Sequence, residues 1–340
     1  MKSYLRVVSI SFLGIVVIVT GFALVTHIVN AARTEHSASQ PPLFPPGSIW
    51  TQDISHAPLD PQSTTMINWL ADQGGWGFGR MQIDFSLRVL HANASTPYVP
   101  FRKADGFIAA DSDPVTEVPL PVGGGLEGQS GYQCAAGGDC HLIVVDRAHS
   151  KLYETWGSNV TDNVLSAAFI AVWDLNRVYP PTGRGDQCTS ADAAGLPIAA
   201  LVFNADEIAA GSINHAIRFV LPNQRMRAHF YVHPATHAGG PSGPSSAPPY
   251  GAHFRLKASY DVSQLMPEAQ VVARAMQKYG MFLSDGGNIA LTAQSDQDTT
   301  AKYANLDFDS HALKALKVTD FEIVDMGTPI HLTDECKLSK

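Results

Sequence analysis

The chain has 340 residues, of which 45% are apolar and 16% are charged. This composition is typical of a chain that folds around a core, and it excludes disorder over most of the length. The 23 basic residues are outnumbered by 31 acidic ones, which gives a formal net charge of -8. The acidic balance argues against a nucleic-acid partner and against an anionic-membrane surface, since both need clustered basic residues.

The first 32 residues are typical of a membrane-directed segment. Lys2 and Arg6 precede an uncharged, mostly apolar run from Val7 to Ala32. The run is longer than a usual secretory core, yet Val29-x-Ala31 fits the small-residue cleavage rule, so residues 1–32 are predicted to be either a signal peptide or an N-terminal membrane anchor. In both cases we expect the rest of the chain to be exported, to the periplasm, to the medium or to the outer face of the cytoplasmic membrane.

Four cysteines follow the leader: Cys134, Cys140, Cys188 and Cys336. An even number in an oxidising compartment suggests two disulfides. Cys134 and Cys140 bracket a short Gly-rich loop and are paired on that ground, which leaves Cys188 with Cys336. A zinc cluster is the alternative, but Cys134-x5-Cys140 lacks the usual two-to-four residue spacing, and we expect no metal or cofactor.

After the leader, the sequence predicts two parts. Residues 33–47 are polar and then Pro-rich, which predicts an extended tether without chemistry. Residues 48–340 are predicted to form a single exported β-rich domain. Two long loops within it, Pro119 to Asp139 and Ala238 to Gly251, could each border a binding cleft.

Short apolar or alternating runs that begin or end at Gly, Pro, Asn or Asp predict strands. They cover residues 141–146, 151–156, 166–175, 212–221, 227–233, 252–260, 280–285, 288–294 and 320–325. Helices are predicted over Pro267 to Tyr279 and, with shorter patterns, over residues 63–74 and 310–317. The predicted fold class is β-dominated α+β, a two-sheet β-sandwich-like domain with a few peripheral helices.

The motifs of several large enzyme classes are missing from the sequence. It contains no GxxxxGK[ST], no GxGxxG after a strand, no HExxH, no EF-hand loop and no GxSxG. Nucleotide-binding, zincin, calcium-sensor and α/β-hydrolase functions therefore lose their usual support.

Polar side chains alternate along two of the predicted strands. His229, Tyr231 and His233 share one face of the first strand, and Arg255 and Lys257 share one face of the second. Such a face can simply be solvated. However, this mixture of side chains suits proton transfer and the binding of sugar hydroxyls or of a carboxylate.

Two carboxylates are candidates for an acid and base pair. Asp192 lies in TSADAAGLPI, and Glu154 lies on the predicted strand KLYETW. Glycoside hydrolysis uses two carboxyl groups about 5 to 9.5 Å apart. The structural alternatives are that Asp192 caps a turn and that the following His215 is a hydrogen-bonded residue at a sheet margin.

The tryptophans could include platforms for sugar rings, because an indole offers a flat apolar face. Most of the five are expected in the core. Trp76, within QGGWGFGR, is predicted to be exposed, since the flanking glycines leave it without a helix or strand to join.

Several long strings carry a resemblance. The run TSADAAGLPI…EIAAGSINHAIRF, with CHLIVVDRAHSKLYETW before it and GAHFRLKASYD…VVARAMQKYGMFLSDGG after it, resembles an uncharacterised family of secreted bacterial β-rich proteins. The likeness covers about residues 41–325 and implies one fold across them, in an exported, glycan-related context. It transfers no catalytic residues.

These observations predict an exported carbohydrate-active enzyme, a glycoside hydrolase acting on a polysaccharide, with the membrane contacted only through the N-terminal segment. The candidate catalytic residues are Glu154, Asp192, His215 and His237, and the candidate substrate-binding residues are Arg218, Tyr231, Arg255, Lys257 and Trp76. One alternative is a polysaccharide lyase that relies on Tyr231, His237 and Arg255. Others are a non-catalytic glycan-binding or cell-envelope protein and, ranked last, a metal site built from His141, His215, His229, His233 or His237.

Overall fold

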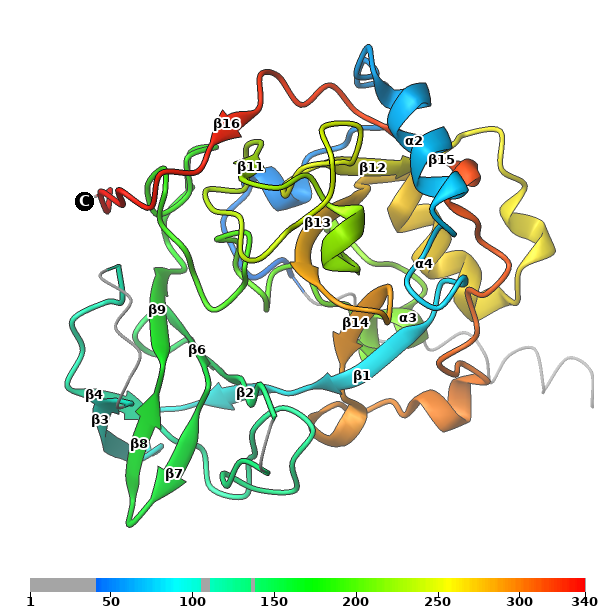
Figure 1. Cartoon of the computed structure of the whole chain (residues 1–340). Helices are drawn as coiled ribbons and strands as arrows, with labels where there is room; N and C mark the ends of the chain where they lie inside the picture. Colours follow the sequence, from blue (N-terminus) through cyan, green and yellow to red (C-terminus); the bar gives the residue numbers. More distant parts are fainter. Residues whose placement is uncertain (1–40, 105–110, 136–137, 340) are drawn as a thin grey trace, which may run out of the picture.

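The computed structural model describes residues 41–104, 111–135 and 138–339. Over these ranges strands dominate and the fold is a β-rich α+β sandwich-like arrangement, so the predicted fold class is confirmed (Figure 1). No helix in the described ranges is long and apolar enough to cross a membrane. The predicted signal or anchor, residues 1–32, lies outside the described residues.

A six-stranded mixed sheet forms one half of the molecule. Its order is β1 (Ile83–Leu87), β14 (Leu291–Gln294), β10 (Ile217–Leu221), β13 (Met281–Gly286), β12 (His253–Leu256) and β15 (Phe321–Ile323). β10 runs parallel to β13, whereas β12 is antiparallel to both β13 and β15. Every residue of β10 is buried, as in a strand covered on both faces.

Helices pack around this sheet (Figure 1). α2 (Ser63–Asp72) packs against β15, and α4 (Pro267–Lys278) packs against β12. Pro267 suits the first turn of α4, because the N–H that it lacks would have no partner there. α3 (Ala205–Ala210) begins with a capping box in which the Asn204 side chain accepts the Glu207 N–H and the Glu207 side chain accepts the Asn204 N–H.

Two four-stranded sheets form the other half. The first has the order β2 (Val89–Ala92), β5 (Leu142–Asp146), β6 (Lys151–Trp156) and β9 (Phe169–Asp174). The second has the order β4 (Glu117–Pro119), β3 (Tyr98–Lys103), β8 (Val164–Ala167) and β7 (Asn159–Thr161). Trp156 pairs with Phe169 where β6 and β9 meet, which places two aromatic rings at one end of the first sheet.

The sheet β2-β5-β6-β9 separates two hydrophobic cores. Along β5, Ile143 and Val145 belong to the large core that the six-stranded sheet shares. Leu142 and Val144 belong to a smaller core. Because neighbouring residues of a strand point to opposite faces, β5 contributes apolar side chains to both cores, and this sheet is buried on both sides.

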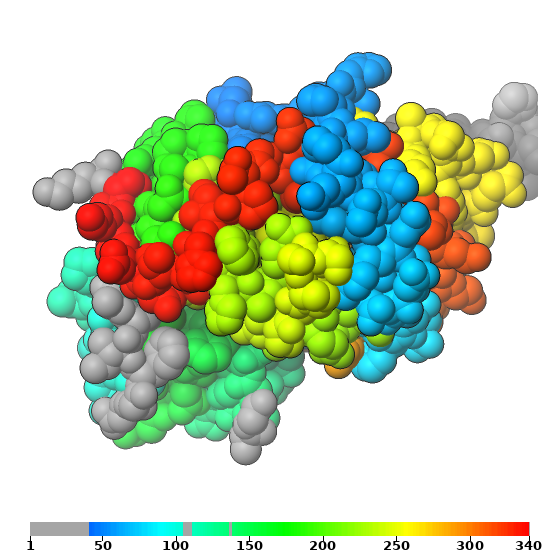
Figure 2. All heavy atoms as spheres, turned by 45° about the horizontal axis from the view of Figure 1, so that its top comes forward, coloured from blue at the N-terminus to red at the C-terminus, as the bar shows by residue number. Residues whose placement is uncertain are grey.

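The C-terminal segment is held against the rest of the chain at several points. β16 (Ile330–His331) pairs with β11 (Phe230–Tyr231), and Cys336 is bonded to Cys188 with an S–S distance of 2.04 Å. Figure 2 shows this segment (red) lying over the surface of the residues coloured green. A second disulfide joins Cys134 to Cys140 at 1.98 Å, so both predicted pairings are confirmed, and they are compatible with an oxidising environment.

Several predicted elements differ from those observed. The predicted strand 151–156 coincides with β6, but 227–233 forms a strand only over Phe230–Tyr231. His229 adopts a left-handed φ of 61° and Pro234 follows His233, and neither feature suits a regular strand. Residues 310–317, predicted to be helical, form turns instead.

The described part of the predicted tether, residues 41–47, is not free of the domain. Phe44 is buried, and its ring lies 5.9 Å from that of Trp50 and 6.3 Å from that of Trp173. Burying a phenylalanine contributes about 2 kcal/mol. The expectation of a free tether is therefore wrong at Leu43 and Phe44, which attach this segment to the large core, whereas most of the prolines around them are exposed.

Candidate functional site

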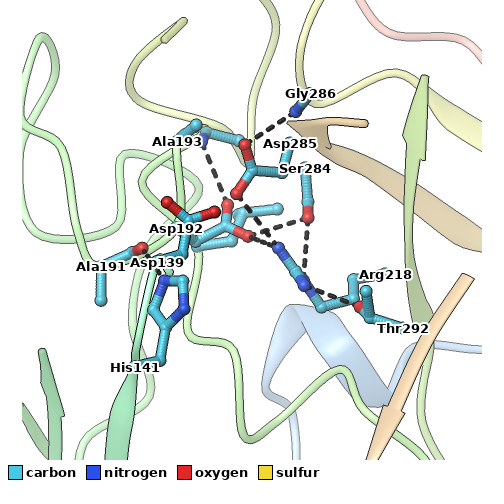
Figure 3. Close-up of polar contacts among 12 residues, drawn as sticks. Asp139, His141, Ala191, Asp192, Ala193, Arg218, Ser284, Asp285, Gly286 and Thr292 are labelled. Atoms are coloured by element: carbon cyan, nitrogen blue, oxygen red, sulfur yellow. Dashed lines mark hydrogen bonds and ion pairs between the residues drawn. The ribbon is translucent and has the colours of Figure 1, made fainter. Parts of the chain in front are cut away.

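A buried guanidinium group lies at the centre of the site. Arg218 is on β10, and its side chain is 5% exposed. Its Nη2 donates to Asp192 Oδ2 at 2.8 Å and lies 3.4 Å from Asp285 Oδ2 (Figure 3). From neighbouring strands, Ser284 Oγ accepts from Nε at 3.0 Å, and Thr292 Oγ1 accepts from Nη1 at 2.7 Å. The charge of Arg218 is thus shared between two carboxyl groups.

Asp192 is the internal member of that pair. The residue is 0% exposed. Its Oδ2 also accepts the Ser284 hydroxyl at 2.8 Å, and its Oδ1 accepts the Ala194 N–H at 3.1 Å. Both carboxylate oxygens therefore accept hydrogen bonds from the protein, and the predicted catalytic role of Asp192 is corrected to a structural one. Asp192 connects its own loop to the six-stranded sheet, a role close to the turn cap that was the structural alternative.

Asp285 is the member that faces solvent. It lies near the end of β13 with 31% of its side chain exposed, and the Gly286 N–H donates to its Oδ1 at 2.7 Å. Burial and the negative charge of Asp192 raise the pKa of Asp285 to about 6, and Arg218 opposes this shift. A carboxyl group with such a pKa holds its proton in mildly acidic solution, where an ordinary aspartate has lost it, and can donate it as a general acid does.

His141 carries a positive charge beside these carboxyl groups. Its Nδ1 donates to Glu127 Oε2 at 2.5 Å, and its Nε2 donates to the Ala191 carbonyl oxygen at 3.0 Å. Burial lowers the pKa of His141, but the hydrogen bond and the charge of Glu127 outweigh burial and raise it to about 8. For Glu127 burial acts in the opposite direction and raises the pKa, but the hydrogen bonds and the charge of His141 outweigh burial and lower the pKa to about 2.

A cavity of about 710 Å³ opens beside these residues. This volume lies within the range of small-molecule and oligosaccharide pockets. Its walls come from segments far apart in the sequence and include Asp139, His141, Trp156, Phe169, Ser190, His237, Gly239, Asp285 and Asp334. Both predicted cleft-bordering loops contribute to it, through Asp139 and Gly239.

Asp139 provides the second exposed carboxyl group of the cavity. Its Oδ1 accepts the indole N–H of Trp156 at 3.1 Å, which places it at the aromatic wall. The neighbouring disulfide of Cys140 anchors this end of the loop. In the view of Figure 3 the carboxyl groups of Asp139 and Asp285 both lie above the His141 ring.

The predicted catalytic residue Glu154 does not line the cavity. It is 0% exposed, and its carboxylate accepts the Trp173 indole N–H at 2.9 Å and the Ala199 N–H at 2.8 Å. Burial raises the pKa of Glu154 to about 7, and the backbone and indole donors oppose the shift. Its predicted role is corrected to a structural one, because both oxygens hold the core together and no part of the residue meets solvent.

The two predicted histidines lie in different places. His237 lines the cavity, where its Nδ1 donates to the Ala193 carbonyl oxygen at 3.0 Å and its Nε2 lies 3.6 Å from Asp334 Oδ1. His215 lines a separate cavity of about 70 Å³ and bonds Glu207 at 3.1 Å. His237 therefore lies at the candidate site, whereas His215 lies at a different cavity.

The predicted substrate-binding residues also scatter. Tyr231 is fully buried and donates its hydroxyl to Asp186 at 3.2 Å, while Arg255 is paired with Glu322 at 2.7 Å. Lys257 donates to a backbone carbonyl oxygen at 2.7 Å. None of these three residues lines the cavity, so their predicted substrate-binding role is corrected to contacts within the protein. Arg218 does not line the cavity either, but it contacts Asp285, which does.

The expectation that Trp76 is exposed is wrong. It is 2% exposed, and its indole N–H donates to the Leu316 carbonyl oxygen at 2.9 Å. Its ring meets those of Phe219 and Phe321 edge-on. The flanking glycines let the chain approach closely, since a Cβ at Gly77 would lie 2.2 Å from a backbone oxygen, and the tryptophan turns inward.

Sequence reasoning missed Asp139, Asp285, Asp334 and Glu127. Asp285 carried a usable signal, because it ends an apolar strand and precedes two glycines. Asp139 carried another, since it adjoins a cysteine that closes a loop. Asp334 carried an indirect signal, because the predicted Cys188–Cys336 pair brings its segment to the loop after β9, but its place at the cavity near His237 is evident only in the structure.

A metal centre finds little support in the part of the chain that the structure describes. The group of potential ligand atoms within 4.8 Å of one another comprises Asp111, Cys188 and Cys336. The two sulfur atoms are bonded to each other, so they are not thiolates and are poor ligands. The five histidines of the metal alternative are not in that group.

We expect Glu127→Gln to lower the pKa of His141 from about 8 toward or below its ordinary value of 6.5, because the variant removes the charge that stabilises the imidazolium ion. In the native protein the pair stabilises the fold fully between the ordinary values of 4.5 and 6.5. This contribution is lost as the pH rises through about 8 or falls through about 2. NMR titration of the His141 ring measures the shift, with the exposed Glu117→Gln as control. An unchanged His141 pKa contradicts the pairing.

No protein-family model, curated protein sequence or solved structure matches this chain. The function therefore has to be argued from the site itself.

Proposed function

We propose that this protein is an exported glycan-active enzyme that hydrolyses a glycosidic bond in the cavity beside Asp285. The observation that carries the proposal is the placement of Asp285: a partly exposed carboxyl group that faces an aromatic-walled cavity and shares Arg218 with the buried Asp192. The disulfides and the membrane-directed leader support export.

Asp285 serves as the general acid of the reaction. It donates its proton to the glycosidic oxygen as the bond from that oxygen to the anomeric carbon breaks. Burial and the negative charge of Asp192 raise the pKa of Asp285 to about 6, so Asp285 keeps this proton up to about pH 6. Arg218 holds both carboxyl groups in place, and it balances the charge that Asp285 acquires when the proton leaves.

Asp139 serves as the second carboxylate. In one route its carboxylate takes a proton from a water molecule that attacks the anomeric carbon, and the water oxygen becomes the new hydroxyl group of the sugar. In the other route it attacks the anomeric carbon itself and forms a glycosyl ester, which a water molecule deprotonated by Asp285 then cleaves. The rings of Trp156 and Phe169 provide apolar surface against which a sugar ring can pack. His237 and Ser190 supply hydrogen-bonding groups for sugar hydroxyls on the remaining walls.

The lyase alternative has weaker geometric support. Of its three residues, only His237 lines the cavity, while Tyr231 and Arg255 are buried in contacts within the protein. Burial raises the pKa of Tyr231 to about 12, which makes it a poor base at neutral pH. The non-catalytic alternative uses the same cavity for binding alone.

A panel of neutral, cationic and uronate-containing polysaccharides tests the proposal. We expect the purified protein, with both disulfides formed, to release new reducing ends from at least one member without a rise in ultraviolet absorbance. A rise in absorbance indicates the unsaturated product of a lyase and overturns hydrolysis. Binding without any turnover across the panel also overturns it, in favour of the non-catalytic alternative.

A further inference from the structure

The charges around the cavity are strongly unequal. Four aspartates line it, namely Asp111, Asp139, Asp285 and Asp334, while no lysine or arginine does so among the residues that the structure describes. One positive group in the wall is His141, and its charge is already paired with Glu127 at 2.5 Å. Asp285 shares Arg218 and Asp111 is buried, which leaves Asp139 and Asp334 as exposed carboxylates in the described wall. These two groups would repel a negatively charged ligand and attract a cation.

Asp139 and Trp156 form a place where a cation can be held. The Asp139 carboxylate is exposed at the cavity, and the contact it makes is with a neutral donor, the indole N–H of Trp156 at 3.1 Å. An ammonium group can bind such a carboxylate by a charge-assisted hydrogen bond and also interact with the neighbouring aromatic ring. The Asp139 carboxylate and the Trp156 ring therefore both favour a positively charged ligand.

Asp334 adds a second exposed carboxylate from another wall. It lies in the C-terminal segment, two residues before the Cys336 that the disulfide ties to Cys188. Its near contact is His237, at 3.6 Å, which is too long for a hydrogen bond. Asp139 and Asp334 therefore border the cavity from segments almost 200 residues apart, and neither is neutralised by an arginine or lysine in the described wall.

We infer that the cavity takes a glycan bearing free amino groups, so that its preferred substrate is a cationic amino-sugar oligomer and not a uronate. This inference rests on the proposed function for the turnover of the substrate, but the charge preference itself concerns binding. Asp334 holds one ammonium group, and Asp139 attracts a second on the sugar whose anomeric carbon it acts on, while Asp285 acts on the glycosidic oxygen.

A matched pair of oligomers tests the inference. A β-1,4-linked glucosamine oligomer and its fully N-acetylated counterpart share a backbone and differ in charge, and an oligogalacturonate provides the opposite charge. At a pH where the amino groups are protonated, we expect the glucosamine oligomer to bind about tenfold more tightly than the acetylated one, since each exposed ion pair contributes about two- to fivefold. Added salt should reduce this preference by screening it.

Two variants and a control locate the preference. Asp334→Asn should reduce the preference for the glucosamine oligomer about two- to fivefold and leave the affinity for the acetylated oligomer nearly unchanged. Asp139→Asn should reduce the preference by a similar factor in the same binding measurement and should also lower turnover, because Asp139 is the second carboxylate of the proposed reaction. Asp162→Asn makes the same charge change in the exposed turn between β7 and β8, outside the cavity lining, and should have no effect.

The outcomes separate the inference from the proposed function. Hydrolysis of a neutral or uronate oligomer without preference for the cationic one overturns the inference and leaves the hydrolase intact. Tight binding of the glucosamine oligomer without turnover supports the inference and overturns the hydrolase. An equal effect of Asp162→Asn and Asp139→Asn shows attraction by overall charge and overturns the assigned site.

Discussion

Replacing Asp285 by asparagine is expected to lower the turnover of the glycan substrate by about 10²- to 10⁴-fold, the usual contribution of a general acid. Asparagine has nearly the same shape but no proton to donate to the glycosidic oxygen. Arg218 keeps its 2.8 Å contact with Asp192 in the variant, so the fold and the affinity for glycan should persist. Steady-state kinetics with the hydrolysed member of the polysaccharide panel measures the loss.

A control and a pH profile make the result specific. Asp72→Asn, at the exposed end of α2, should leave turnover unchanged. The native activity should fall as the pH rises through about 6, because Asp285 then loses the proton that it must donate. If Asp285→Asn keeps turnover within a few-fold of the native value, Asp285 is not the acid.

Replacing both Cys188 and Cys336 by serine is expected to lower the free energy of unfolding by about 5 kcal/mol on the chain-entropy model. The bond joins residues 148 positions apart, so its removal greatly increases the conformational entropy of the unfolded chain. Asp334 and Cys336 both line the cavity, and the released C-terminal segment should also weaken glycan binding. Chemical denaturation and binding measurements give the two effects.

The second disulfide provides a matched control. Cys134 and Cys140 are 6 positions apart, so their replacement by serine should cost only about 2 kcal/mol. Because Asp139 adjoins Cys140, this variant should alter the aromatic side of the cavity and leave the wall around Asp334 in place. Equal losses of stability from the two double variants would contradict the loop-length argument.

The site gives different roles to two carboxyl groups that share one cation. Asp192 has both oxygens occupied by protein donors, and its negative charge acts on Asp285. Asp285 has solvent on one side and a raised pKa. A carboxyl group tuned by a buried neighbour is a recurrent way to keep an acid protonated near neutral pH.

Local patterns were sufficient for much of the secondary structure and for the covalent framework. The alternation in KLYETW and the apolar run of β5 predicted strands that the structure contains, because burial on sheet faces repeats every two residues. Pro267 and the following pattern predicted α4 to within one residue. The disulfide pairing followed from the number of cysteines and the short loop between two of them.

Local patterns failed where a residue's surroundings come from distant segments. Glu154 alternates with apolar neighbours and resembles a solvent-facing carboxylate, yet it shares the face of Leu152 that turns toward the large core, where Trp173 and Ala199 satisfy it. Trp76 looks exposed between glycines, but those glycines allow the close approach that buries it. A sequence does not state which face of a strand another layer will cover.

The sequence by itself determined the class of fold, the strand-forming segments, the paired cysteines and the acidic charge. Only the tertiary structure decided the site, because Asp139 and His141, Asp285, and Asp334 lie in three segments that meet through sheet pairing and through the Cys188–Cys336 bond. The strength of an acid depends on burial and on charges within a few ångströms, and these neighbours are set by how the layers pack. For that reason Asp285 borders the cavity, whereas Glu154 is enclosed in the core.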